Sequence, residues 1–167
     1  MLNDTIEKAF NQQLNAEAFS AYLYLAMSAW FDAGNLPGMA SWMKLQAGEE
    51  LEHALKFYDQ IQERGGTVHL MQIDTPQAEW DSPLAAFEAA YEHEQKVTGM
   101  IHDLVDLAIS EKDHAANAFL QWFVTEQVEE EDSALSIVEK LQLAGDSPGA
   151  LFMIDRELGQ RGGSDDH

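Results

Sequence analysis

The chain has 167 residues, of which 30 are Asp or Glu and 9 are Lys or Arg, so its formal net charge at neutral pH is −21. This acidic excess disfavours a nucleic-acid backbone or an anionic membrane surface as partner, because both require clustered cationic side chains. It favours cations, or only keeps the protein soluble. With no cysteine in the sequence, any metal must be held by oxygen and nitrogen ligands.

The length and a 46% content of hydrophobic residues favour one domain with a single core. No apolar run approaches the roughly 20 residues that span a bilayer. The first residues also lack the basic and apolar regions of a signal peptide. We therefore expect a cytoplasmic protein that does not enter a membrane.

Breaks containing glycine or proline separate stretches rich in Ala, Leu, Glu, Gln and Met, which favour helix. The predicted helices cover residues 4–33, 37–64, 83–111, 114–144 and 148–158. Four long helices of matched length indicate an all-α fold, a four-helix bundle with a short fifth C-terminal helix, in a domain over residues 1–158. The glycine-rich remainder, residues 159–167, predicts a flexible tail.

The connection over residues 65–81 is unusually long for a bundle. At roughly 3.3 Å per residue it reaches at most about 56 Å, whereas a helix of this length measures about 42 Å. The connection can therefore run the whole length of the bundle and let the second and third helices lie parallel. Val68, Leu70 and Ile73 alternate with more polar residues, so we expect part of it to be extended and half buried.

Each long helix carries a carboxylate where its apolar, core-facing stripe requires a hydrophobic residue. Glu17 follows Phe10 by one heptad, Glu50 follows Met43, and Glu94 follows Phe87; the last helix places Phe123, Glu130 and Ile137 on one row. Burying several unpaired carboxylates is costly unless a cation lies between them. Counted from the helix ends, the heights of Glu17, Glu50, Glu94 and Glu130 span only about 6 Å, so the four can converge on one point.

Glu50 and His53 form a Glu-x-x-His motif, which places a carboxylate and an imidazole on one helix face. A single motif of this kind occurs often by chance. Joined to three further core-facing glutamates at one height, it predicts a metal site. Ligands rich in oxygen with one nitrogen suit iron or manganese, and shared carboxylates suit two metals.

Other residues near this point have two interpretations. Glu126 and Glu130 share a core-facing side, with Glu129 and Glu49 beside them, so these four either form a third cation site or belong to a solvated acidic face. Tyr24 follows Glu17 by one heptad and is either a buried hydrogen-bond donor to a ligand or a one-electron donor. Trp122 is a weaker redox candidate, since an aromatic residue near a core usually serves packing.

Three segments resemble the haem-free, bacterial-type ferritins of the ferritin-like di-iron superfamily. They are residues 15–22 around Glu17, residues 49–53, and residues 119–131. The resemblance covers nearly the whole chain. It implies a ferroxidase that oxidises Fe(II) with O₂ or H₂O₂ and stores the ferric mineral inside a 24-subunit homo-oligomeric cage.

The resemblance also implies the ligand sets. One iron would be held by Glu17, Glu50 and His53, and a second by Glu50, Glu94 and Glu130 with Gln127 nearby. A third iron site would use Glu49, Glu126, Glu129 and Glu130. Helix 148–158 would pack around the four-fold axis of the cage.

Two departures limit what is carried over. Bacterioferritins hold haem through a methionine at the position of Leu51 and have a second Glu-x-x-His where this chain has Gln127 to Glu130, so we expect no haem. Animal ferritins line their three-fold channels with acids at positions that match Asn117 and Leu120, so an acidic channel of that kind is not expected. The iron route is left open.

Two other classes compete with storage. A di-iron redox enzyme of the rubrerythrin or ribonucleotide-reductase type shares the bundle but usually carries two Glu-x-x-His motifs. A DNA-protecting mini-ferritin places its ligands between subunits and often has a basic tail, whereas this chain ends in Asp165, Asp166 and His167.

Overall fold

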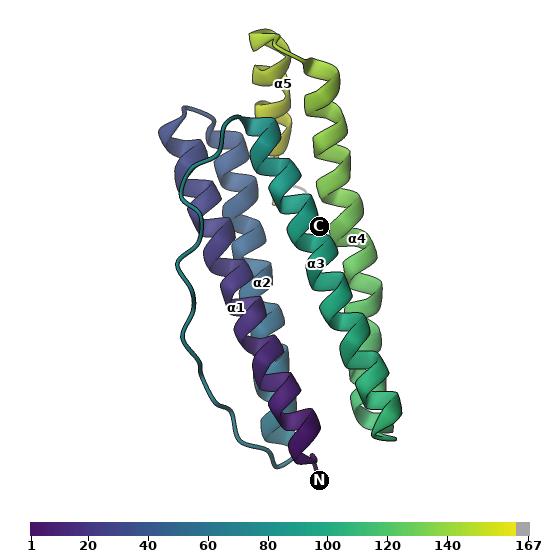
Figure 1. Ribbon diagram of the computed structural model, residues 1–167. Helices are drawn as coiled ribbons and strands as arrows, with labels where there is room; N and C mark the ends of the chain where they lie inside the picture. Colours follow the sequence, from purple (N-terminus) through teal and green to yellow (C-terminus); the bar gives the residue numbers. More distant parts are fainter. Residues whose placement is uncertain (163–167) are drawn as a thin grey trace.

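The computed structural model describes residues 1–162, which form an all-α fold. Its five helices are α1 (Asp4–Ala33), α2 (Pro37–Glu63), α3 (Pro83–Ser110), α4 (His114–Ala144) and α5 (Pro148–Leu158). All five helices begin and end within one residue of the ranges predicted from the sequence. The predicted four-helix bundle with a short C-terminal helix is confirmed (Figure 1).

Local sequence explains where the helices begin. The side chains of four N-cap residues accept a hydrogen bond from the backbone N–H three residues on; these are Asn3, Ser82, Asp113 and Ser147. Proline occupies the first turn of α2, α3 and α5. Helix α2 has Leu36 at its N-cap and no side-chain cap of its own. Its Met39 N–H instead donates to the carboxylate of Asp155 on α5, at 2.8 Å.

The connection between α2 and α3 runs along the length of the bundle beside α1, so α2 and α3 are parallel, as expected (Figure 1). Side chains of α1 hold it in place. Asn11 donates to the carbonyl of Thr67 at 3.0 Å, and Asn15 donates to the carbonyl of Gln72 at 3.1 Å. Val68 is half buried, but the expectation was wrong for Leu70 and Ile73, which are 76% and 40% exposed.

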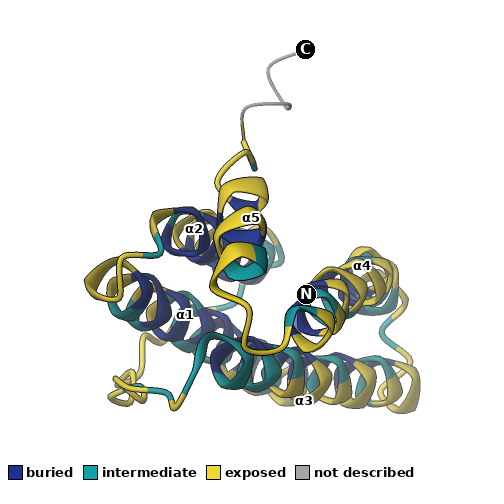
Figure 2. Cartoon of the chain, turned by 90° about the horizontal axis from the view of Figure 1, so that it is seen from above, coloured by how far each residue is buried: buried dark blue, intermediate teal, exposed yellow. Residues whose placement is uncertain are grey.

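Two apolar clusters fill the bundle, one toward each end. One contains Tyr24, Met43, Phe87 and Leu141, and the other contains Phe10, Phe57, Ile101 and Phe123. Buried residues face inward on all four long helices (Figure 2). On each of these helices a stretch of two to four turns separates the buried members of the two clusters, and that stretch includes the predicted carboxylate.

The segment after α5 differs in part from the flexible tail expected over residues 159–167. Residues 159–162 are described, and Arg161 contacts α2. The rest of the expected tail, residues 163–167, lies outside the described residues. Within residues 1–162, no helix combines the length and the apolar character needed to cross a membrane.

Candidate metal centre

The structure brings the predicted core-facing ligands together at mid-height in the bundle. Three groups of side chains each offer ligand atoms that lie within 4.8 Å of one another. They are Glu17 with Glu50 and His53, Glu50 with Glu94 and Glu130, and His53 with Glu126 and Glu130. The first two groups share Glu50, so its carboxylate is placed to bridge two cations.

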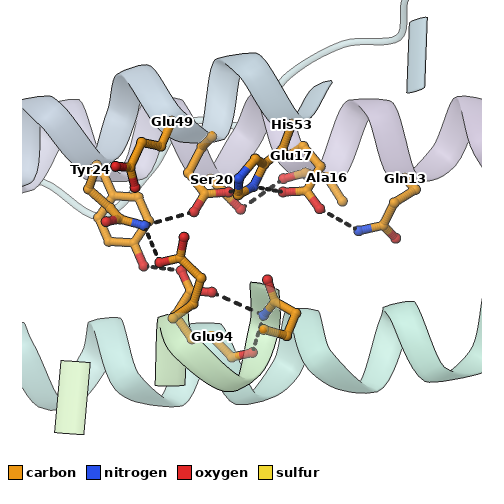
Figure 3. A network of polar contacts seen from close by, with 12 residues as sticks. Gln13, Ala16, Glu17, Ser20, Tyr24, Glu49, His53 and Glu94 are labelled. Carbon is orange, nitrogen blue, oxygen red and sulfur yellow. Dashed lines mark hydrogen bonds and ion pairs between the residues drawn. The ribbon is translucent and has the colours of Figure 1, made fainter. Parts of the chain in front are cut away.

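The centre is buried, although it is strongly polar. Glu17, Glu50 and Glu94 are each 1% exposed, and Glu130 is 6% exposed. Figure 3 shows Glu17 and His53 facing Glu94 across the bundle. Glu17 and Glu50 come from the antiparallel pair α1 and α2, and the other two from α3 and α4.

Two buried atoms in the first group have no hydrogen-bond partner within the described part of the chain. They are Glu17 Oε2 and His53 Nδ1. The imidazole Nδ1 lies 3.2 Å from Glu50 Oε2 and 3.9 Å from Glu17 Oε2, without the geometry of a hydrogen bond. Unpaired buried polar atoms are costly. A cation placed between these carboxylate oxygens and the imidazole would satisfy both, so this donor set fits a metal.

Glutamine amides donate to several of the other carboxylate oxygens. Gln13, one helical turn before Glu17, donates to Glu17 Oε1 at 3.0 Å. Gln46, one turn before Glu50, donates to Glu50 Oε1 at 3.0 Å and to Glu130 Oε2 at 2.6 Å. These amides hold the carboxylates in position in the absence of a cation.

Tyr24 and Gln127 both donate to Glu94. The Tyr24 hydroxyl hydrogen-bonds Glu94 Oε1, which fits the first interpretation of this residue, a buried donor to a ligand. Gln127 donates to Glu94 Oε2 at 3.2 Å and to Thr98 Oγ1 at 3.1 Å. Glu94 therefore has a donor on each oxygen, and Gln127 is tied to the centre, as the resemblance implied.

Burial changes the acidity of the whole centre. It raises the pKa of Glu17 and of Glu50 well above the ordinary carboxyl value, and neighbouring carboxylates raise them further. Burial also raises the pKa of Glu94. Burial together with the charge on Glu94 raises the pKa of Glu130 to about 8. In the absence of a cation Glu130 therefore holds a proton near neutral pH, and burial disfavours the ionised forms of Glu17, Glu50 and Glu94.

The proposed third cation site is only partly assembled. Glu126 and Glu130 approach each other, with His53 as the third member of the group. Glu49 and Glu129 belong to none of the three groups found among residues 1–162. The Glu49 carboxylate instead pairs with Arg161 at 2.9 Å, and Glu129 is exposed.

Three further positions from the sequence can now be placed. The Trp122 ring packs edge-on against His53, with ring centroids 5.3 Å apart, and Lys56 Nζ lies 4.1 Å from the Trp122 ring centroid. Leu120 is fully buried in the core. Asn117 is half buried and accepts a hydrogen bond from Gln121.

Sequence reasoning missed three residues that contact the ligands. Gln46 lies one heptad before His53 on a core-facing row, so the signal that identified the glutamates could have found it. Gln13 is buried between Phe10 and Glu17 on the core-facing side of the same helix, so the same signal could have found it. Arg161 lies in a segment without periodicity, and its contacts arise only from the tertiary fold.

Comparisons with known proteins agree with this geometry. Residues 7–144 match the ferritin-like domain family. A bacterial non-heme ferritin of Bacteroides fragilis is 44% identical over 161 residues, covering 96% of this chain and all of that protein. A bacterial non-heme ferritin of Escherichia coli is 37% identical and covers 95% of this chain and 96% of its own length.

The fold comparison gives the same result. The crystal structure of an open pore ferritin from the archaeon Archaeoglobus fulgidus superposes with a TM-score of 0.96 and 53% sequence identity. The match covers 96% of this chain and 99% of that one. A match over most of the chain, at this identity and with a metal-ligand cluster in the bundle, leads to one conclusion: the chain belongs to the ferritin family.

Proposed function

We propose that this protein stores iron and is a ferroxidase. Fe(II) would be oxidised to Fe(III) by O₂ or H₂O₂ at Glu17, Glu50, His53, Glu94 and Glu130, and the ferric mineral would be kept in a hollow cage of 24 copies in the cytoplasm. The observation that carries the proposal is the pair of buried ligand groups that share Glu50. The names of the relatives, non-heme ferritins, support storage without haem.

The two groups would take one Fe(II) ion each. Carboxylate oxygens with one imidazole nitrogen are suitable ligands for iron. Concentrated negative charge in a site shielded from water stabilises Fe(III) relative to Fe(II) and so favours loss of an electron. Two Fe(II) ions side by side give up two electrons together. These electrons and two protons convert O₂ to H₂O₂, or convert H₂O₂ to two molecules of water.

The chain's own residues orient the ligands and handle protons. Gln13, Gln46 and Gln127 each donate to a carboxylate of the centre. Tyr24 holds Glu94, and whether it also donates an electron is a separate question that Tyr24→Phe would test. The carboxyl groups that hold protons without a cation lose them when iron binds, so protons are available at the centre during oxidation.

Storage requires a homo-oligomer, and the exposed side chains are consistent with one. Leu143 is 91% exposed, and Phe152 and Met153 on α5 are 65% and 71% exposed. Apolar side chains this exposed at one end of a subunit are typical of a surface that another subunit covers. Packing of α5 around a four-fold axis would cover them.

Stopped-flow measurement of Fe(II) oxidation tests the ferroxidase assignment. Glu17→Ala and His53→Ala should each slow the rapid phase by at least about tenfold, the usual scale for loss of one electrostatic or coordinating group. Glu52→Ala is a matched control, because Glu52 lies on the same helix but is exposed. Rapid oxidation at the wild-type rate in either ligand variant would contradict the assignment.

Sizing of the purified protein separates storage from a rubrerythrin-type redox enzyme. Twenty-four chains of 18.7 kDa form a particle of about 450 kDa, whereas the competing class would give a monomer or dimer. This chain has one Glu-x-x-His on a core-facing helix row, Glu50 to His53, whereas its other match, Glu111 to His114, spans the exposed turn between α3 and α4. A single core-facing motif favours storage.

A further inference from the structure

Residues 159–162, which follow α5, reach the metal centre through the Arg161 side chain. Its Nη2 lies 2.9 Å from Glu49 Oε2 and donates to Gln46 Oε1 at 3.1 Å. Its Nη1 donates to the carbonyl oxygen of Trp42 at 3.2 Å, and the guanidinium lies 4.5 Å from the centroid of the Trp42 ring. These four contacts on α2 define one bound position for the guanidinium, which is planar and carries several donors in a fixed arrangement.

Arg161 determines which way the Gln46 amide faces. A guanidinium can only donate, so the Gln46 oxygen must face Arg161. The amide nitrogen then faces the opposite way, where it donates to Glu50 and Glu130. Gln46 is 1% exposed, so water cannot easily replace either interaction. The segment after α5 is thus connected by hydrogen bonds to two carboxylates of the centre.

The same guanidinium forms an ion pair with Glu49, a carboxylate that the expected third cation site requires. Glu49 would be a ligand of that site, but its Oε2 is already paired with Arg161. The amide that Arg161 orients also engages Glu130, another expected ligand. Both interactions engage oxygen atoms that a cation would need, and Glu49 belongs to none of the ligand groups formed by residues 1–162.

We propose that Arg161 is an internal cation that competes with a metal ion for Glu49 and so controls occupancy of the third site. A metal ion there and Arg161 on Glu49 exclude each other. By reciprocity, a metal ion bound at this site releases the segment after α5 from α2 to the same extent that Arg161 weakens the metal. This inference rests on the proposed metal-binding function of the centre.

The expected effect follows from the exposure of the ion pair. The side chains of Arg161 and Glu49 are 24% and 45% exposed, so their attraction is that of a partly solvated pair. Removing such a competitor should tighten cation binding at the third site about two- to fivefold. Binding at the two groups that share Glu50 should change less, because Arg161 touches neither directly.

Zn²⁺, which has no redox chemistry, is the probe. We would titrate the assembled, metal-free protein by calorimetry, comparing wild type with Arg161→Gln. Lys44→Gln is the matched control, because Lys44 lies beside Glu49 and Arg161 in a surface pocket of about 250 Å³ and its loss also removes a positive charge there. The pair Glu49→Gln and Glu49→Gln/Arg161→Gln completes a double-mutant cycle.

We expect Arg161→Gln to raise the Zn²⁺ affinity of the weakest class of sites and Lys44→Gln to leave that affinity unchanged. In protein that already carries Glu49→Gln, Arg161→Gln should have no effect on it. Crystals soaked in Zn²⁺ should show stronger anomalous density beside Glu49 in Arg161→Gln than in wild type. Equal isotherms for wild type and Arg161→Gln, or the same change in Lys44→Gln, would overturn the inference while leaving the metal centre intact. Failure of wild type to bind Zn²⁺ at all would instead overturn the proposed function.

Discussion

Metal binding to the centre should release protons, and Glu130 sets the minimum number. Burial and the charge on Glu94 raise the pKa of Glu130 to about 8. At pH 7 a group with that pKa is protonated in about nine molecules out of ten. A bound cation requires the ionised carboxylate, so its arrival displaces the proton.

The expected count is therefore at least about 0.9 proton per centre at pH 7 from Glu130 alone. Glu17, Glu50 and Glu94 add to this number, since burial raises the pKa of each of them too. Because each released proton makes affinity depend on pH, the logarithm of the Zn²⁺ binding constant should rise by about one or more per pH unit between pH 6 and pH 7.

Calorimetric titration with Zn²⁺ in buffers of different ionisation enthalpy measures the count directly. The observed enthalpy plotted against the buffer enthalpy has a slope equal to the number of protons released. Glu130→Gln should lower the slope by about one proton, and Glu52→Gln, which alters an exposed residue of α2, should not. A slope near zero in wild type would mean that the carboxyl groups are ionised before the metal arrives, and would refute the reasoning.

Two further predictions concern stability, and a third concerns assembly. In the folded state Glu130 keeps its proton up to about pH 8, whereas in the unfolded state it loses the proton near pH 4.5. The free energy of unfolding of the metal-free protein should therefore fall by up to about 5 kcal/mol as pH rises between these values. Thermal unfolding measured from pH 5 to 8 should show this fall, and Glu130→Gln should make stability nearly independent of pH over the range. Phe57→Ala removes a fully buried ring and should cost about 3–5 kcal/mol in the unfolding free energy measured with denaturant; a loss below about 1 kcal/mol would contradict the packing. In Gly38→Ala the new Cβ would lie 1.7 Å from the Asp155 carbonyl oxygen, so α5 should detach from α2. Size-exclusion chromatography should then show less of the large particle. The control Gly48→Ala, where a Cβ meets nothing within 4 Å, should assemble normally.

The helices and the ligand positions could be predicted because both depend on local pattern. Proline and N-cap residues at the helix starts, such as Ser82 and Ser147, act within one turn of the chain. The heptad rows of Glu17 and Glu94 place both side chains in the core, since the residues one heptad before and after each of them are hydrophobic. The common height of the glutamates then followed from counting residues along the helices.

The remaining contacts depend on tertiary structure, which local pattern does not encode. Asp155 caps α2 from α5, a contact between residues more than a hundred positions apart. Arg161 lies among glycines, in a stretch that sequence composition alone marks as unstructured, yet it binds Trp42 and Gln46. The alternation around Leu70 predicted partial burial, but the connection is held by hydrogen bonds between its backbone and side chains of α1, and Leu70 and Ile73 are exposed.

The formal charge of −21 counts every Asp and Glu as ionised, which overestimates the negative charge of the metal centre when no cation is bound. The buried carboxyl groups lie between two apolar clusters, where an ionised group without a partner is costly. A proton on Glu130 neutralises part of this charge when no cation is present, and a cation neutralises it after displacing the proton. Burial of these carboxyl groups therefore destabilises the metal-free bundle and also favours the exchange of protons for metal. Replacing a ligand carboxylate by its amide should raise the stability of the metal-free protein and lower its affinity for metal.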